Sequence, residues 1–479
     1  MAVPAAVLAV DVVEVPFTGD RSGTAPLTWG QQAIWNAILR TAPNDIYFNI
    51  GRLLSLPERG RRTGLAQLTA AVAALMERHE ALRTRLRGTE RTPEQVPVQA
   101  LSDSGLLPLT VVDEPRPEHA DAAAHHLLDR LSATRFDYER EWPLRVGAVR
   151  SGGRVTHAVL VLCHLACDGH AAEQVVRDLR LLVVRGSAGR KPRATPMDLA
   201  VEQHGPAGVR RSERALAHWE SFYRSIPPTM FPRQAAAPQT PRFWSGRLVS
   251  EALAMATDAL AAAHRVSGST VLMTGMAALV AADGGHGTAA MMPIVANRTA
   301  ADHRDLVAML SQDAPFLLDT TSAVRFTDLL PVAWRAAMAG YRAAAYDPVA
   351  WEALRERIGQ ERGTPVHPYC CYNDQRFFAR PPADGPPPGA DELRKARTRT
   401  RFSFPATQER LGCRYCVHVT EEQGTLAVML TADTAYLPPT AIRAHLEALE
   451  ELITAAACGS SPLLSDLPGL LGRGDAART

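Results

Sequence analysis

A short apolar run that ends in a polar heptapeptide constrains the fold of this chain more than any other feature. Residues 157–162 read His-Ala-Val-Leu-Val-Leu, and residues 163–169 follow as Cys-His-Leu-Ala-Cys-Asp-Gly. Aliphatic and β-branched residues bounded by Gly152-Gly153 predict a buried strand. From Ala171 onward the apolar residues recur at helical spacing. The segment therefore predicts a core strand, a turn at Asp168-Gly169 and a helix, which is an α/β unit.

His164 lies at the end of the predicted strand, and this makes it a candidate for chemistry. A side chain at that place reaches the mouth of a cleft while its backbone is held rigidly, as a catalytic base requires. A histidine at a strand end is also common as a hydrogen-bonded residue of the core boundary. For a histidine judged by its position alone, this core-boundary interpretation is the favoured one.

Length and charge narrow the classes of protein to which the chain can belong. A chain of 479 residues exceeds one ordinary core, which predicts two lobes. The formal net charge is +2 and the basic residues are scattered, so nucleic acid is not an expected partner. No stretch is apolar enough to span a membrane, and residues 1–10 lack the basic leader of a signal peptide. We therefore expect a cytoplasmic protein.

The cysteines predict neither a disulfide framework nor a metal site. There are seven of them, an odd number in a long chain. Cys413-Arg-Tyr-Cys416 and the pair Cys370-Cys371 have the spacing of zinc ligands. However, residues 414–419 have the pattern of a strand, on which side chains three positions apart point to opposite faces. The cysteines are therefore expected to be buried structural thiols.

Apolar periodicity and breaks divide the chain into segments. Thr28 is the expected N-cap of a first helix, and leucines and valines between Leu65 and Leu82 mark an amphipathic second helix. Residues 186–208 are polar and contain proline, which predicts a crossover linker. Residues 425–431 predict a strand, and a helix is expected after it from Pro439 to Ala457. The predicted organisation is an N-terminal lobe over 1–185, this linker, a C-terminal lobe over 209–465 and a frayed tail over 466–479.

The heptapeptide resembles the His-His-x-x-x-Asp-Gly motif of the condensation-domain superfamily, which includes chloramphenicol acetyltransferase and the amide-forming domains of nonribosomal peptide synthetases. Cys163 replaces the first histidine, whereas His164, Asp168 and Gly169 are in register. Weaker signatures of the family follow in the correct order, and the resemblance covers residues 25–460. These weaker signatures are the Leu-Thr start of a helix in 26–35, Arg-His-Glu-Ala-Leu-Arg-Thr at 78–84, the Phe-Asp…Pro-Leu-Arg segment that leads into a strand in 136–146, and Pro-Ile-Val-Ala-Asn-Arg at 293–298.

The resemblance implies a fold, a reaction and a set of partners. The fold is two chloramphenicol-acetyltransferase-like lobes, each a sheet flanked by helices, arranged as a V-shaped pseudodimer with a central channel. The reaction is acyl transfer, in which an amine or hydroxyl attacks a thioester. No cofactor is bound permanently, because the acyl donor arrives on the phosphopantetheine of a carrier protein or of CoA. The implied partners are acyl or peptidyl carrier proteins and a small amine or alcohol.

The resemblance also assigns catalytic roles to two residues of the turn. His164 acts as general base on the acceptor or orients it by hydrogen bonding, and the residues do not separate these two roles. Gly169 permits close approach of the backbone and a positive φ, and its N–H is a candidate donor to the developing oxyanion.

Four further residues are assigned to the support of this loop. Asp168 pairs with an arginine in the family, and Arg298 or Arg78 is the expected partner, since an unpaired buried carboxylate is destabilising. Cys163 is expected to point away from the channel because adjacent residues of a strand alternate faces. No residue is assigned to a cofactor or a metal.

The leading functional hypothesis is a free-standing condensation enzyme that forms an amide or ester in natural-product biosynthesis. An acyl-CoA-dependent acyltransferase is a second hypothesis. A catalytically silent recruitment module is a third, because Cys163 alters the motif. Epimerisation is less favoured, since its additional acidic signature is not found. Fold alone does not separate these functions, because function depends on the site.

Overall fold

The computed structural model describes residues 10–56, 63–89, 96–377, 388–422 and 424–472. The chain forms two compact units. Unit 1 contains residues 1–209 and 296–311, and unit 2 contains residues 210–295 and 312–479. The first lobe therefore extends beyond the predicted boundary at 185, and it includes a segment from the second half of the chain.

Unit 1 is built on a mixed sheet in which the strand of the heptapeptide lies inside. The order is β1-β6-β7-β8-β3, with β6 and β7 parallel and the other neighbours antiparallel. The predicted strand before the heptapeptide is confirmed as β8, which lies between β7 and β3. The bounds are β1 Val10–Thr18, β6 Ser104–Asp113, β7 Leu144–Ser151, β8 Arg154–Cys163 and β3 Asn49–Ser55.

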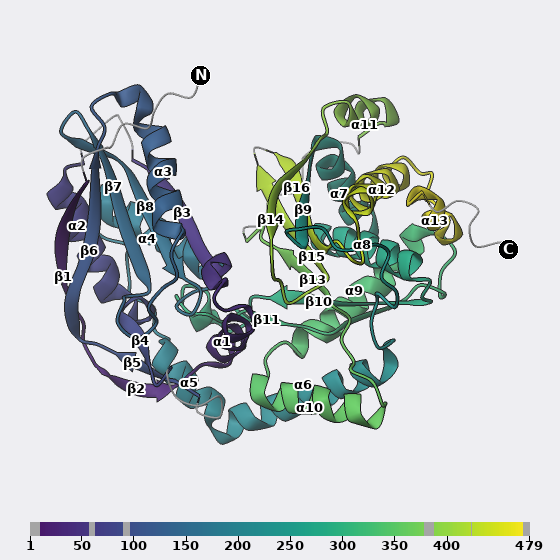
Figure 1. Ribbon diagram of the computed structural model, residues 1–479, viewed down its shortest axis with the longest axis horizontal. Helices are drawn as coiled ribbons and strands as arrows, with labels where there is room; N and C mark the ends of the chain where they lie inside the picture. Colours follow the sequence, from purple (N-terminus) through teal and green to yellow (C-terminus); the bar gives the residue numbers. More distant parts are fainter. Residues whose placement is uncertain (1–9, 57–62, 90–95, 378–387, 423, 473–479) are drawn as a thin grey trace. The chain divides into compact units, whose positions relative to one another are not determined.

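Helices cover both faces of this sheet (Figure 1). α2 (Leu65–Arg78) and α4 (Gly169–Arg185) pack on one face, and α3 (Ala120–Ser132) packs on the other. Residues 158–163 of β8 alternate between the core on one face and two smaller cores on the other, as the period of a strand requires. The amphipathic second helix ends at Arg78, and Leu82 lies in the following 3-10 turn η2 (Glu80–Arg83).

The other elements of unit 1 surround the main sheet. α1 (Trp29–Thr41) begins at Thr28, as predicted, and the N-cap is a capping box: the Thr28 hydroxyl accepts from the Gln31 N–H at 3.2 Å, and the Thr28 N–H donates to Gln31 Oε1 at 2.9 Å. The remaining elements are the sheet β2 (Gly23–Pro26), β5 (Val98–Leu101) and β4 (Thr84–Arg87), with the 3-10 turns η1 (Asp45–Phe48) and η3 (Pro117–His119).

The segment 186–208, predicted as a crossover linker, contains a helix that packs on unit 1. This segment contains α5 (Pro196–His204), and its Met197 and Ala200 are buried against β2 and β5 of unit 1. α6 (Pro206–Ser225) follows after a single residue, Gly205. The Thr195 hydroxyl caps α5 by accepting from the Asp198 N–H.

Unit 2 contains a larger mixed sheet. The strand order is β11-β10-β13-β15-β16-β9-β14, and β12 pairs with β10. The predicted strands near residues 414–419 and 425–431 are confirmed as β15 and β16. The bounds are β9 Phe243–Ser250, β10 Thr288–Val295, β11 Gln312–Asp313, β12 Phe316–Asp319, β13 Cys370–Asp374, β14 Arg401–Gln408, β15 Tyr415–Glu422 and β16 Thr425–Asp433.

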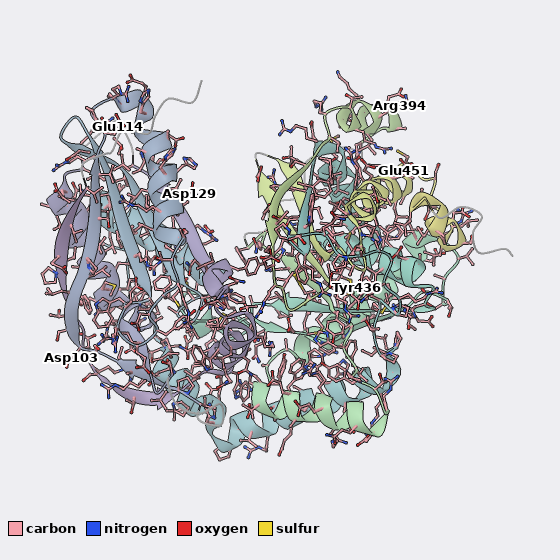
Figure 2. The ribbon with its side chains drawn as sticks, in the orientation of Figure 1. Asp103, Glu114, Asp129, Arg394, Tyr436 and Glu451 are labelled. Atoms are coloured by element: carbon pink, nitrogen blue, oxygen red, sulfur yellow. A yellow bond between two sulfur atoms is a disulfide. The ribbon has the colours of Figure 1, made fainter. Side chains whose placement is uncertain are left out.

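The helices of unit 2 share one hydrophobic core with this sheet. α8 is buried along most of its length, and α12 has the bounds predicted from the sequence. Arg397 at the end of α11 donates to Glu451 of α12 at 2.5 Å, and Figure 2 labels Glu451. The bounds are α7 Glu251–His264, α8 Gly268–Gly284, α9 Phe326–Arg342, α10 Pro348–Glu361, α11 Ala390–Arg397, α12 Pro439–Ala457 and α13 Leu467–Leu470, with the turns η4 Ala301–His303 and η5 Leu464–Asp466.

Two further expectations concern the end of the chain and membranes. The tail predicted over 466–479 is ordered in its first part, because Leu467 and Leu471 are buried in the core of unit 2, and residues 473–479 lie outside the described residues. Among the described residues, no single helix is long and apolar enough to cross a membrane. α7 and α8 reach that length and composition only as a pair bent by 105°.

Candidate active site

The heptapeptide forms a strand end, a turn and a helix start within unit 1. β8 ends at Cys163, His164 begins the turn, and Asp168 is the N-cap of α4. The turn is closed by a hydrogen bond from the Ala166 N–H to the Cys163 carbonyl at 2.9 Å. His164 thus projects from an ordered turn between an internal strand and a capped helix, as the sequence predicts.

The hydrogen bonding of His164 fixes its tautomer. Its Nδ1 lies 3.0 Å from the carbonyl oxygen of Cys167. A carbonyl oxygen only accepts, so Nδ1 carries the proton and Nε2 of the neutral ring carries the lone pair. Burial lowers the pKa of His164, and the negative charge of Asp168 opposes that effect only in part. The imidazole is therefore neutral at pH 7, and Nε2 is able to accept a proton.

Asp168 is buried and saturated with donors. Its Oδ1 accepts from the Ala171 N–H at 2.9 Å, which caps α4, and from Arg298 Nη2 at 2.8 Å. Its Oδ2 accepts from the Leu310 N–H at 3.1 Å and from the N–H and hydroxyl of Ser311 at 3.2 and 3.1 Å. Burial alone raises the pKa of Asp168, but the charge of Arg298 and these donors outweigh burial and lower it. Asp168 is therefore a charged anchor and is not a second base.

Arg298 holds the segment 296–311 in place around Asp168. Its Nη1 donates to the carbonyls of His303 and Leu306 at 3.0 and 2.9 Å, and Nη2 also donates to the Ala308 carbonyl at 3.2 Å. The side chain is 6% exposed, so the ion pair with Asp168 is almost fully desolvated. A pair of this kind gains strongly from its additional hydrogen bonds.

The segment 296–311 inserts apolar side chains into three cores of unit 1. Val307 packs with α2 and α4, Met309 packs with α1, and Leu306, Ala308 and Leu310 pack with Leu199 of α5. Asn297 closes the base of the segment through a hydrogen bond from Nδ2 to the Leu310 carbonyl at 3.0 Å. The segment is therefore an integral part of the structure that surrounds the turn.

Arg78 does not pair with Asp168, so this alternative for the partner is corrected. Arg78 Nε donates to Asp178 Oδ2 at 2.7 Å, and the His79 ring shares the same oxygen at 3.0 Å. Both nitrogens Nη1 and Nη2 of Arg78 donate to the carbonyls of Gly189 and Arg190. Arg78 thus fastens the middle of α4 and the chain after it. It supports the active-site helix at another point than predicted.

The structure corrects one expected property of Gly169 and shows the environment of Cys163. Gly169 is the first residue of α4 and has no positive φ, so its predicted backbone freedom is not used. Its N–H belongs to the first helical turn, where N–H groups lack an intrahelical acceptor. Cys163 is buried beside Trp35 and Phe136, and burial raises the pKa of its thiol to about 12. A protonated thiol is a poor nucleophile.

The expectation of reduced thiols is wrong for two cysteines. Cys371 and Cys416, which are neighbours on the parallel strands β13 and β15, form a disulfide. Their sequence separation of 45 residues hid the pairing, because it depends on strand register. Within the described residues, no group of three or more His, Cys, Asp or Glu side chains is arranged to hold a metal ion.

Two contacts of the turn were missed by sequence reasoning. Ser311 binds Asp168 through its backbone N–H and its hydroxyl. Phe48 meets the His164 ring with centroids 6.1 Å apart and planes at 65°. No local pattern indicates either contact, since each joins residues that are more than a hundred positions apart.

Comparison with known proteins gives the family. The condensation domain model matches residues 22–373. The probable nonribosomal peptide synthetase CymA of Salinispora arenicola is 27% identical over 365 residues, which are 73% of this chain and 4% of that protein. The chain thus spans a small part of this relative.

Solved structures show the same fold. The condensation domain of the monacolin K polyketide synthase MokA aligns with a TM-score of 0.72 at 15% identity, over 93% of this chain and all of that one. The X-domain solved in complex with OxyB from teicoplanin biosynthesis aligns with a TM-score of 0.63 at 18% identity, over 94% of this chain and 96% of that one. The predicted chloramphenicol-acetyltransferase-like fold of two lobes is confirmed, and the chain belongs to the condensation domain family.

Proposed function

We propose that the chain catalyses acyl transfer from a thioester to an amine or hydroxyl acceptor, forming an amide or ester in natural-product biosynthesis. Condensation domains act on acyl groups carried by carrier proteins or CoA. The observation that carries the proposal is the tautomer of His164, because a neutral imidazole with Nδ1–H bound to the Cys167 carbonyl presents Nε2 as a base. Its rigid support by Asp168 and Arg298 suits that role.

In the proposed reaction, His164 takes one proton from the acceptor and later gives it to the leaving thiolate. The acceptor nitrogen or oxygen forms a bond to the thioester carbon while Nε2 of His164 takes its proton. The tetrahedral intermediate then loses the thiolate, which receives the proton from His164 and leaves as a thiol. Base catalysis contributes about 10²–10⁴-fold, and alignment of two bound substrates contributes as much as roughly 7–11 kcal/mol. The Gly169 N–H is the proposed donor to the oxyanion.

We further propose that the donor is held on separate acyl or peptidyl carrier proteins in the cytoplasm. A single condensation domain aligns with 93% of this chain, and this supports a donor that is presented by another domain. Free CoA thioesters are the alternative donor. The two donors share the phosphopantetheine thioester, and an assay that presents both of them distinguishes the two cases.

A silent recruitment module is the second candidate. It is favoured by Cys163, which occupies the position of the first motif histidine, and by the shared fold with an X-domain that was solved bound to OxyB. In that case the neutral His164 and its buried supports stabilise the turn without catalysis. This candidate predicts that replacing His164 changes no chemical rate.

The decisive experiment measures thiol release from acyl-pantetheine, acyl-CoA and acyl-carrier thioesters, with and without amines and alcohols. Wild type is compared with His164→Ala and with His157→Ala as the matched control, because His157 lies on β8, the strand that ends directly before His164, and is also partly buried. We expect acceptor-dependent release that falls by about 10²-fold or more only in His164→Ala, with the product mass showing the new bond. Equal rates in all three proteins support the recruitment module instead.

A further inference from the structure

Asp45 is a buried carboxylate near the candidate active site, and the proposed reaction does not use it. It is the first residue of η1, and its side chain is fully buried. Its Oδ2 accepts from Arg135 Nε at 2.7 Å and from the Tyr138 hydroxyl at 2.5 Å. Burial raises the pKa of Tyr138, so the phenol keeps its proton and donates it to this bond.

The other end of η1 contacts the candidate base. Phe48 is the last residue of η1, and its ring meets the His164 ring edge to face at 6.1 Å. The next residue, Asn49, begins β3 and pairs with Cys163, which directly precedes His164. η1 therefore joins Asp45 at one end to the wall beside His164 at the other.

Tyr138, one of the two residues that donate to Asp45, is itself held in place by its neighbours. The Tyr138 ring packs edge to face on Trp35 of α1 with centroids 5.5 Å apart, and the Arg135 guanidinium lies 5.2 Å from its centroid. The Tyr138 carbonyl accepts from the Leu86 N–H of β4 at 2.8 Å. Because Tyr138 is packed and hydrogen-bonded on three sides, it holds Asp45 in a fixed position.

We propose that Asp45 is a positioning residue for acyl transfer: held by Arg135 and Tyr138, it fixes η1 so that Phe48 keeps the His164 ring oriented and shielded from water. The inference rests on the proposed function, in which His164 is the base. Asp45 Oδ1 is buried and has no hydrogen-bond partner among the described residues. A buried acceptor without a donor costs free energy, and its retention is consistent with a constraint other than stability.

The test compares Asp45→Asn with a buried acid of the same kind in unit 2. Asp433 has a 3% exposed side chain and accepts from Arg242, which is 46% exposed, at 3.0 and 2.8 Å. Asp45 has a fully buried side chain, and Arg135 is 47% exposed. Asp433→Asn thus controls for the general effect of neutralising a buried, paired carboxylate. Phe48→Leu is the second test variant, because it removes the ring while Asp45 keeps its partners.

Two readouts are measured on the full chain. The first is kcat and KM for acceptor-dependent thiol release, per folded protein. The second is the titration of the His164 ring by NMR, assigned by its loss in His164→Gln. The charged group known to face this ring is Asp168, and none of the test variants changes it.

If Asp45 positions His164, Asp45→Asn and Phe48→Leu lower kcat by about 10- to 100-fold with KM within about twofold. The midpoint of the His164 titration rises toward the ordinary value of about 6.5, because water then reaches the ring. Asp433→Asn changes neither readout. A merely structural role lowers the melting temperature of Asp45→Asn and leaves the titration and kcat as in wild type, which overturns the inference.

The NMR titration separates this inference from the proposed function. A wild type without turnover refutes the proposed function, while the titrations of Asp45→Asn and Phe48→Leu still decide whether η1 shields His164. If Asp45→Asn does not fold, Phe48→Leu alone decides, since a wild-type titration in that variant also overturns the inference.

Discussion

In Asp168→Ala, the segment 296–311 should detach from the rest of unit 1 by local opening. This opening should be far more frequent than in a variant that lacks any one partner of Asp168. Asp168→Ala takes away the acceptor of five donated hydrogen bonds and leaves Arg298 buried without its anion. Breaking a buried ion pair by deleting one partner costs about 3–5 kcal/mol. Loss of the N-cap of α4 adds about 1 kcal/mol.

Two variants of the donors to Asp168 should lower the stability of the segment 296–311 by less. Arg298→Met removes the cation, but the N–H groups of Ala171 and Leu310 and both donors of Ser311 still reach Asp168. Ser311→Ala removes one hydroxyl bond, worth about 1 kcal/mol. The expected order of damage is therefore Asp168→Ala, then Arg298→Met, then Ser311→Ala.

Amide hydrogen exchange reports this damage at the affected groups, because the N–H atoms of Leu310 and Ser311 are the ones that Asp168 binds. A loss of about 3 kcal/mol raises the exchange of a peptide covering 296–311 by roughly a hundredfold when local opening governs exchange. Asp433→Asn is the control and leaves this peptide unchanged. Exchange of Asp168→Ala within about twofold of wild type would refute the reasoning from burial and hydrogen bonding.

Three further predictions concern titration and sulfur chemistry. Since burial lowers the pKa of His164, kcat/KM should fall only as the pH drops below about 6.5, and a midpoint above that value in the pH–rate profile contradicts a desolvated base. Because burial raises the pKa of the Cys163 thiol to about 12, Cys163→Ala should keep most of the proposed acyl-transfer rate, and iodoacetamide should not abolish that rate through this residue. Peptide mapping without reductant should recover Cys371 linked to Cys416, and reduction should lower the stability of unit 2 by at most about 4 kcal/mol in urea unfolding.

Local patterns predicted the elements that their own sequence determines. The apolar run before the heptapeptide forms β8, and the helix expected over residues 439–457 has those bounds. One local signal was missed, since Thr195-Pro196 followed by Asp198 has the residues of a helix start and begins α5. That helix is short and its apolar residues contact unit 1, so its periodicity was weak in isolation.

The contacts that complete the candidate site depend on distant residues, and no local pattern contains them. The Leu310 and Ser311 amides reach Asp168 only because the segment 296–311 packs in unit 1, and that packing uses three separate cores. Asp45 has no sequence signal at all, because its partners lie about ninety positions away on the loop after α3.

The sequence left Arg298 and Arg78 as alternative partners of Asp168, and it could not decide between them. Both arginines have side chains that are less than a tenth exposed, and each binds an aspartate in or next to α4, so residue type does not separate them. The second aspartate, Asp178, lies ten residues after Asp168, which is about 15 Å along a helix. One guanidinium cannot reach both carboxylates, so each aspartate pairs with an arginine of its own. Only the packing of each arginine against α4 assigns Arg298 to the turn before the helix and Arg78 to the middle of the helix.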